Sequence, residues 1–65
     1  MNLTDSDLGE IERLGNCAIH ELVFALQHAE QGTGDDALTC IVQVQQNCEA
    51  MADKILAQLK ADGEA

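Results

Sequence analysis

The chain has 65 residues, of which 46% are hydrophobic, and it contains one aromatic residue and no proline. This length limits it to one domain, and the hydrophobic content excludes a disordered acidic tail. The formal net charge is −9, from 12 acidic and 3 basic residues. Such a balance argues against binding to nucleic acid or to a membrane surface, because both require basic patches. We therefore expect protein partners.

The N-terminal residues lack the basic start and the apolar stretch of a signal peptide, and no apolar run is long enough to span a membrane. The three cysteines, at positions 17, 40 and 48, are an odd number, and their spacing matches neither a disulfide scaffold nor a paired zinc motif. These features predict a cytoplasmic protein without membrane contact.

A first helix is predicted over about residues 4–31. Thr4 is positioned to cap it, Asp5 and Asp7 lie in its first turn, and Leu3 and Leu8 occupy the staple positions. Apolar residues then recur in steps of three, four and seven, at positions 8, 11, 18, 22, 25 and 29. This spacing is typical of a helix with one apolar stripe.

A turn is predicted at residues 32–34, where Gly32 can end the first helix in the left-handed conformation. Thr33 or Asp35 can cap a second helix, which is predicted over about residues 35–61 and is expected to fray near its end. Its apolar stripe runs through positions 37, 41, 44, 48, 51, 55 and 59. Residues 1–65 therefore form one helical-hairpin domain in this interpretation.

The two stripes match when the helices fold back on each other, because facing positions then sum to about 66. This pairing sets Gly15 against Met51, and it places Leu22 and Ile41 near the centre of the hairpin. The remaining facing pairs are Ile11 with Ile55, Ala18 with Cys48, Leu22 with Val44, Ala25 with Ile41, and Ala29 with Ala37. The predicted fold is all-α, an antiparallel helical hairpin.

The apolar arc on both helices is wider than one helix–helix contact requires. Self-association would cover the remainder, so we predict that the hairpin forms a homodimer, a four-helix bundle. The residues expected in the core of the hairpin or in the dimer interface are Leu8, Ile11, Leu14, Leu22, Leu26, Ile41, Val44, Cys48, Ile55 and Leu59.

Residues 37–48 are twelve consecutive positions without charge, although 12 acidic and 3 basic residues are spread over the rest of the chain. An exposed helix normally carries charge on its solvent side, so this segment is expected to have neighbours on more than one side. Interface cores are depleted in charged residues. The residues that we expect to bind a partner protein are His20, Phe24, Gln27, His28, Val42, Gln43 and Gln46.

Phe24 falls off the apolar stripe of the first helix when residues are placed at about 100° intervals. In one interpretation it is an exposed anchor for a partner, since aromatic residues dominate interface energetics. In the other, the dimer contact extends around the helix and buries it. The sequence leaves both open.

Cys17, His20 and Glu21 supply the residue types of a nucleophile, a base and an orienting acid. A two-helix hairpin, however, offers no obvious concave pocket or oxyanion hole for them. Cys17, His20 and His28 could ligate a metal ion, but a fourth ligand is not evident. We therefore expect no catalytic site, no metal and no cofactor.

The plan of residues 4–61 resembles that of the Rop-like helical-hairpin dimers, which are plasmid copy-number regulators. The likeness lies in chain length, two long helices, a short turn and dimerisation. It implies a four-helix bundle that binds RNA through basic and polar residues around an aromatic residue. In this resemblance Phe24 corresponds to the aromatic residue. Arg13 is the one basic residue on the first predicted helix. The chain is also similar in plan to small phage-encoded helical hairpins that inhibit bacterial host regulators, such as quorum-sensing anti-activators and anti-CRISPR proteins.

These features predict a non-enzymatic protein-binding modulator. In its most concrete form, this is a phage or mobile-element protein that binds and inhibits or regulates a bacterial host protein, for example a transcription regulator. The alternatives are a Rop-like RNA-binding regulator and a structural assembly subunit. RNA binding would depend steeply on salt through phosphate contacts, whereas docking through an uncharged surface would not.

Overall fold

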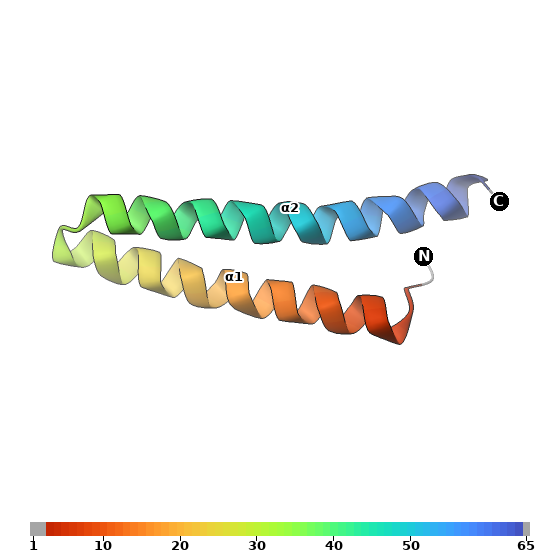
Figure 1. Ribbon diagram of the computed structural model, residues 1–65, viewed down its shortest axis with the longest axis horizontal. Helices are drawn as coiled ribbons and strands as arrows, with labels where there is room; N and C mark the ends of the chain where they lie inside the picture. The colour runs from red at the N-terminus through yellow and green to blue at the C-terminus, as the bar shows by residue number, and fades with distance from the viewer. Residues whose placement is uncertain (1–2, 65) are drawn as a thin grey trace.

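Two long helices lie side by side and run in opposite directions in the computed structural model, which describes residues 3–64 (Figure 1). α1 spans Asp5–Gln31 and α2 spans Gly34–Glu64, and no strand occurs between residues 3 and 64. The Cα atoms extend over 51 × 19 × 10 Å. The expected all-α helical hairpin is therefore confirmed.

α1 begins where the sequence predicts, because Thr4 caps it. The backbone of Thr4 is extended, and its hydroxyl oxygen accepts a hydrogen bond of 3.1 Å from the backbone N–H of Asp7. Asp5 and Asp7 lie in the first turn, where the helix dipole favours negative charge. The cap and the two carboxylates together stabilise the start of the helix.

Gly32 ends α1 in the left-handed conformation that the sequence predicts, with a φ of 81°. Its N–H donates to the carbonyl of Ala29 at 3.2 Å, and the N–H of Thr33 donates to the carbonyl of His28 at 2.9 Å. These two hydrogen bonds are those of a Schellman motif, which satisfies the last carbonyls of a helix. The chain reverses its direction within Gly32 and Thr33, so the turn is one residue shorter than the sequence indicates.

Thr33 contacts both helices. Its carbonyl accepts a hydrogen bond of 3.0 Å from the N–H of Ala37, the first such bond of α2. Its hydroxyl donates to the carbonyl of His28 at 3.0 Å and lies 2.9 Å from His28 Nδ1. The hydroxyl thus closes the turn, while Asp35 and Asp36 supply the negative charge at the start of α2.

α2 begins at Gly34, one residue before the expected start, and it continues to Glu64, three residues beyond the expected end at 61. Gly63 does not end the helix. A glycine within a helix lowers stability by only about 1 kcal/mol, and the chain has no proline that would stop it.

The helices meet along a seam with alternating steps of three and four residues, the spacing of a coiled coil. The buried side chains in the described part of the chain are Leu14, Ala18 and Ala25. Partly buried residues continue the seam: Asp7, Ile11, Glu21 and His28 on α1, and Ala37, Cys40, Val44, Asn47, Met51, Lys54 and Gln58 on α2.

The pairing of facing positions agrees with the sequence, but the seam is displaced around the helices. A Cβ atom on Gly15 would lie 3.5 Å from Met51 Sδ, as that pairing requires. Leu14 is buried in the seam, whereas Leu22, expected at the centre of the hairpin, is 53% exposed. Ile41 is partly buried. Part of the apolar stripe that the sequence predicts as core is therefore exposed in the single hairpin.

The two helices are closest near the turn and splay toward the opposite, open end of the hairpin (Figure 1). Side-chain size explains this shape. Ala25 is buried and Ala37 is partly buried near the turn, and their small side chains permit close approach of the helices. Leu14 and Met51 lie nearer the open end and hold the helices further apart.

Candidate functional site

Six of the ten large apolar side chains that are exposed among the described residues lie on one side of the seam. Each directly follows a seam residue in the sequence, so it lies about 100° further around its helix. Exposure reaches 61–63% at Ile19, Leu26 and Leu38. We call this surface the apolar face, and its residues are Leu8, Gly15, Ile19, Leu22, Leu26, Leu38, Ile41, Cys48, Ile55 and Leu59.

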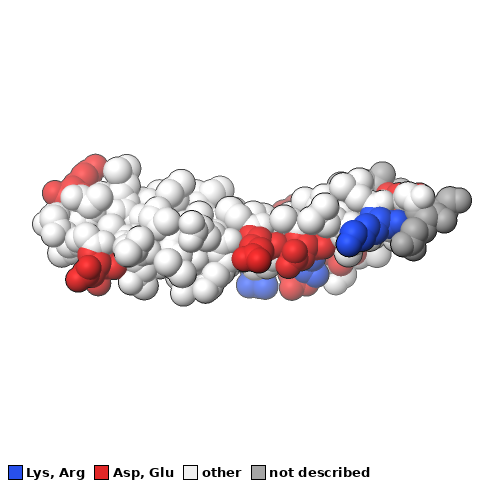
Figure 2. Space-filling view, turned by 90° about the horizontal axis from the view of Figure 1, so that it is seen from above, with Lys and Arg blue, Asp and Glu red and all other residues white. Residues whose placement is uncertain are grey.

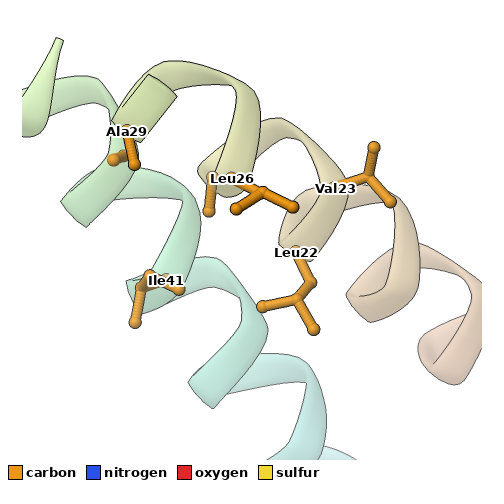
Figure 3. A pocket seen from close by; sticks show the side chains of 7 residues that line it. Leu22, Val23, Leu26, Ala29 and Ile41 are labelled. Atoms are coloured by element: carbon orange, nitrogen blue, oxygen red, sulfur yellow. The ribbon is translucent and has the colours of Figure 1, made fainter. Parts of the chain in front are cut away.

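The apolar face contains a hollow near the turn, with a volume of about 530 Å³ (Figure 3). Leu22 and Leu26 of α1 stand along it opposite Ile41 of α2, and Val23 lies at its outer rim. Its floor is formed by three alanines, Ala25, Ala29 and Ala37. We call it the turn-side hollow; it exists because small side chains lie between larger ones.

A second hollow of about 350 Å³, the middle hollow, follows on the same face. Leu22 lies between the two hollows and lines both. The other residues that line it are Gly15, Ala18, Ile19, Val44, Cys48 and Met51. Every side chain around either hollow is uncharged, so both are suited to apolar side chains of another protein.

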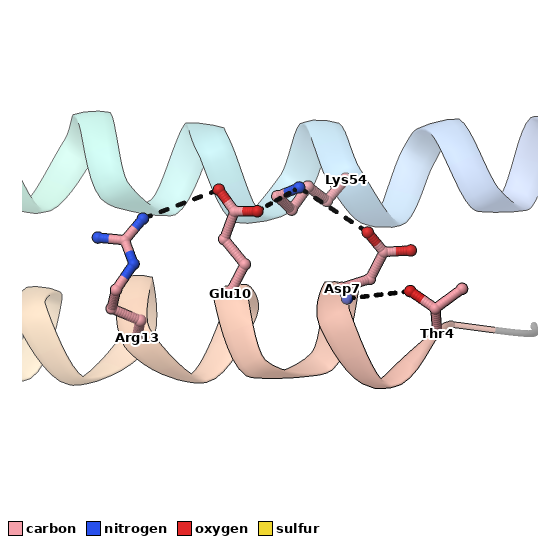
Figure 4. A network of polar contacts seen from close by, with 5 residues as sticks. All are labelled: Thr4, Asp7, Glu10, Arg13 and Lys54. Atoms are coloured by element: carbon pink, nitrogen blue, oxygen red, sulfur yellow. Dashed lines mark hydrogen bonds and ion pairs between the residues drawn. The ribbon is translucent and has the colours of Figure 1, made fainter.

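The opposite side of the seam is polar, and its residues directly precede seam residues. We call it the polar flank, and its residues include Glu10, Cys17, His20, Phe24, Gln27, Asp36, Gln43 and Gln46. Near the open end, Lys54 Nζ lies 2.9 Å from Glu10 Oε2 and 3.9 Å from Asp7 Oδ1 (Figure 4). Arg13 reaches the same Glu10 at 3.8 Å. The two contacts of Lys54 join α1 to α2 where the helices splay, whereas the pair of Arg13 and Glu10 lies within α1.

Glu21 and Cys40 meet in the seam. Partial burial of the thiol, its hydrogen bond to Glu21, and the negative charges of Glu21 and Asp36 hold the pKa of Cys40 above its ordinary value. A raised pKa lowers the fraction of thiolate, which is the nucleophilic form of cysteine. Cys40 is therefore poorly suited to nucleophilic chemistry.

Phe24 is 50% exposed and belongs to the polar flank. It lies two residues from both Leu22 and Leu26, a rotation of about 200° around the helix, which places it on the side opposite the apolar face. The hairpin pairing sets it against Gln43, which directly precedes the seam residue Val44. The side chain lines neither hollow.

The structure brings five of the seven expected partner-binding residues to the polar flank. These are His20, Phe24, Gln27, Gln43 and Gln46. Val42 lies on the outer face of α2, away from the seam. His28 is partly buried at the turn, where its Nδ1 lies 2.9 Å from the Thr33 hydroxyl.

Charge is distributed unevenly along the hairpin. Residues 14–48, on the turn side, contain four acidic residues and no Lys or Arg. Figure 2 shows acidic side chains gathered at the turn and again toward the open end, with an uncharged stretch between the two groups. The basic residues all lie in the open-end half, and they are Arg13, Lys54 and Lys60.

Neither helix is apolar over a length that could cross a membrane, within residues 3–64. In the same part of the chain, no group of three or more His, Cys, Asp or Glu side chains is placed to hold a metal ion. Cys17 and Cys48 are exposed free thiols, and Cys40 is a partly buried one.

Sequence reasoning named most of the residues that line the hollows as stripe or core positions, but it found neither the hollows nor the ion pairs of Lys54 that join the helices. Ile19 and Leu38 flank the expected stripe and belong to the apolar face. Lys54 was not matched with Glu10, although its position after Met51 continues the steps of three and four residues. The signal that would have found both is the two-sided pattern of mostly polar residues before seam positions and apolar residues after them.

Comparisons with protein-family models, with curated proteins and with solved structures find no match for this chain.

Proposed function

We propose that this chain is a non-enzymatic protein-binding modulator that pairs with a second copy through its apolar face and binds another protein through its polar flank. The observation that carries the proposal is the mismatch between what the hairpin buries and what it exposes. Three apolar side chains are buried among the described residues, while ten large ones are exposed, six of them on the apolar face.

The elongated hairpin exposes more surface than a compact monomer of its mass would, which supports self-association. The hairpin exposes 4711 Å², whereas surface scaling gives about 4,000 Å² for a folded monomer of 7.0 kDa. The excess of roughly 700 Å² is close to the about 800 Å² that each partner buries in a standard interface. Two hairpins that cover each other's apolar faces form a four-helix bundle, which is the predicted dimer.

The polar flank stays free in such a dimer, because it lies on the other side of the seam. Phe24 is the large apolar side chain on it, and uncharged Gln43 and Gln46 accompany it. An aromatic anchor among uncharged polar groups has a low desolvation cost and suits a protein partner.

RNA is a poorer partner for this flank. Phosphate contacts need Lys or Arg, and residues 14–48 contain neither. Lys54 and Arg13 are also already paired with carboxylates of α1. The partner class that we propose to test first is a bacterial regulatory protein. This choice rests on the similarity in size and helix content to the phage-encoded inhibitors named above.

Two native cysteines report on the dimer without mutation. Cys48 lines the middle hollow and Cys17 lies on the polar flank, and both are exposed in the single hairpin. We expect alkylation of Cys48 to slow as the protein concentration rises, while alkylation of Cys17 stays constant. Light scattering should show twice the chain mass over the same range.

A matched variant sharpens this test. Leu26→Glu places a charge at the turn-side hollow, so it should keep the protein monomeric and make the Cys48 rate independent of concentration. A constant Cys48 rate in the wild-type protein, with the mass of one chain throughout, would contradict the dimer.

The partner surface is tested by capture followed by titration. Proteins and RNA retained from bacterial lysate by the immobilised wild-type chain are identified by mass spectrometry and sequencing. The retained protein is then titrated against wild type, Phe24→Ala and the control Asn16→Ala, which changes an exposed residue outside the polar flank. We expect Phe24→Ala to weaken binding at least tenfold, about 1.4 kcal/mol, and the control to have no effect. Retention of RNA with a steep salt dependence would instead favour the Rop-like alternative.

A further inference from the structure

The two ends of the polar flank carry different charge. Toward the open end, the acidic Glu10 and Asp53 lie beside the basic Arg13 and Lys54, so the formal charges of these four residues cancel. Glu10 contacts both basic side chains, at 2.9 Å from Lys54 and 3.8 Å from Arg13. Toward the turn, Asp36 is the one Asp, Glu, Lys or Arg that directly precedes a seam residue. The flank is therefore balanced at the open end and negative at the turn.

The surroundings of Asp36 add negative charge and supply no cation. Glu30 and Asp35 are also exposed beside the turn, where Figure 2 shows acidic side chains gathered. Residues 14–53 contain no Lys or Arg, so the nearest basic residue on α2 is Lys54, about 27 Å from Asp36 along the helix axis. No ion pair within residues 3–64 involves these three carboxylates. The dipole of α2 stabilises Asp35 and Asp36, but no side chain neutralises them.

Phe24 lies between these two ends of the polar flank. The hairpin pairing sets it against Gln43. Asp36 precedes Gln43 by seven residues and is therefore about 10 Å nearer the turn, whereas Asp53 follows Gln43 by ten residues and is about 15 Å nearer the open end. A partner that covers Phe24 can thus reach an unpaired carboxylate on the turn side, while the charges on the other side are already matched within the hairpin.

We propose that the protein partner of the polar flank presents an apolar pocket for Phe24, bordered by Lys or Arg side chains that meet Asp36 on the turn side. This inference rests on the function proposed above and adds the chemistry of the partner and the position of its charges. A second copy of this chain does not fit the flank, because its net charge is also −9. Complementary charge speeds association and disfavours partners of like charge.

A pair of synthetic peptides with blocked ends probes this chemistry on the unmodified chain. Both hold a leucine between glycines, and lysines flank it in one peptide and glutamates in the other. Each is titrated into the ¹⁵N-labelled protein while the amide chemical shifts are followed. We expect the lysine peptide to shift the amides of Phe24, Asp36 and Gln43, and the glutamate peptide to leave them unchanged. Shifts spread equally over the acidic residues of both ends, shifts centred on the apolar face, or no shifts at all would overturn the proposal.

Two matched variants locate the charge that matters. Asp36 and Asp53 are both exposed, and both directly precede a seam residue of α2, so Asp36→Asn and Asp53→Asn remove the same charge at opposite ends of the flank. We expect Asp36→Asn to weaken binding of the lysine peptide about two- to fivefold, the size of an exposed ion pair, and Asp53→Asn to leave it unchanged. The difference should shrink as salt is added. Asp36→Glu keeps the charge and should keep the affinity, and circular dichroism checks that each variant stays helical.

The protein retained in the capture experiment separates this inference from the proposed function. Weaker binding of Phe24→Ala and of Asp36→Asn, with Asp53→Asn unchanged, supports both. Weaker binding of Phe24→Ala with equal affinities for Asp36→Asn and Asp53→Asn would overturn the charge preference and leave the polar flank as the binding surface. Unchanged binding of Phe24→Ala would overturn both.

Discussion

The two sides of the seam use the same helices for different purposes. The apolar face collects leucines and isoleucines around two uncharged hollows, whereas the polar flank carries Phe24 and adjoins the seam residues that form the ion pairs of Lys54 and the contact between Glu21 and Cys40. A hydrophobic residue can therefore be equally exposed on either side and have a different role. Under the proposed function, exposure alone does not distinguish a residue of the dimer interface from a residue that binds the partner, whereas the side of the seam does.

The largest expected effect comes from truncating a side chain of the apolar face. Leu22 borders both hollows and is 53% exposed in the single hairpin. The proposed dimer would cover it, so Leu22→Ala should destabilise the protein by about 2–5 kcal/mol in denaturant melts. The matched change Phe24→Ala, at 50% exposure on the polar flank, should leave the melting temperature nearly unchanged.

Equal losses of stability in Leu22→Ala and Phe24→Ala would show that the two sides of the seam do not differ in their contribution to folding. A loss for Phe24→Ala as large as that of Leu22→Ala would mean that the dimer contact wraps around α1 and covers the aromatic ring. Val42, Gln43 and Gln46 would then remain as partner-binding candidates.

Two glycines of α1 give a smaller effect in the stabilising direction. Gly9→Ala meets no other atom within 4 Å and should gain about 1 kcal/mol from helix propensity. Gly15→Ala places its Cβ 3.5 Å from Met51 Sδ, an ordinary contact, so it should gain a similar amount. Chemical denaturation measures both. A gain at Gly9 with a loss at Gly15 would show that a second copy occupies the middle hollow more tightly than the single hairpin reveals.

The ion pairs of Lys54 should contribute less to stability than these glycine substitutions do. Lys54→Gln removes the 2.9 Å contact with Glu10 and the 3.9 Å contact with Asp7. Because these side chains are still partly exposed, we expect a loss of about 0.2–1 kcal/mol that shrinks as salt is added. Arg13→Gln, which breaks an exposed pair at 3.8 Å, is the control and should cost less. A loss for Lys54→Gln that does not change with salt would contradict the electrostatic explanation.

The smallest expected effect on stability comes from the titration of Cys40. Its pKa is raised in the folded protein, so the folded state holds this proton more tightly than the unfolded state does. The resulting stabilisation is fully present below the unfolded thiol pKa, and it is lost as pH rises through the folded value. Thermal melts from neutral to alkaline pH should show this decline in the wild type and in Cys17→Ala, and a weaker decline in Cys40→Ala. Identical pH profiles in all three would exclude a role for this thiol.

The sequence predicted the features that depend on local chemistry. Thr4 caps α1 and Gly32 ends it in the left-handed conformation, because only neighbouring residues decide these points. The pairing of Gly15 with Met51 was also predictable, since a turn of two residues leaves little freedom in register. Phe24 was correctly placed off the core stripe.

The displaced seam was not predictable in the same way. Leu22 and Leu14 are equally apolar, and helical periodicity places both near the stripe without saying which faces the other helix. The hairpin buries Leu14, and it carries Glu21 and Lys54 in its seam because each finds a partner across it. Such pairings are three-dimensional, so they become visible only when both helices are placed.

The position of the three basic residues has a consequence for proteolysis. Trypsin cleaves after Lys and Arg, and residues 14–53 contain neither. Its earliest cuts therefore fall after Arg13, whose side chain is 63% exposed, and at Lys54 and Lys60. The fragment that survives holds the whole turn and both hollows but has lost Leu8 and Leu59. The rate at which trypsin attacks the folded chain is therefore decided by the accessibility of Arg13, Lys54 and Lys60, all of which lie in the splayed half of the hairpin.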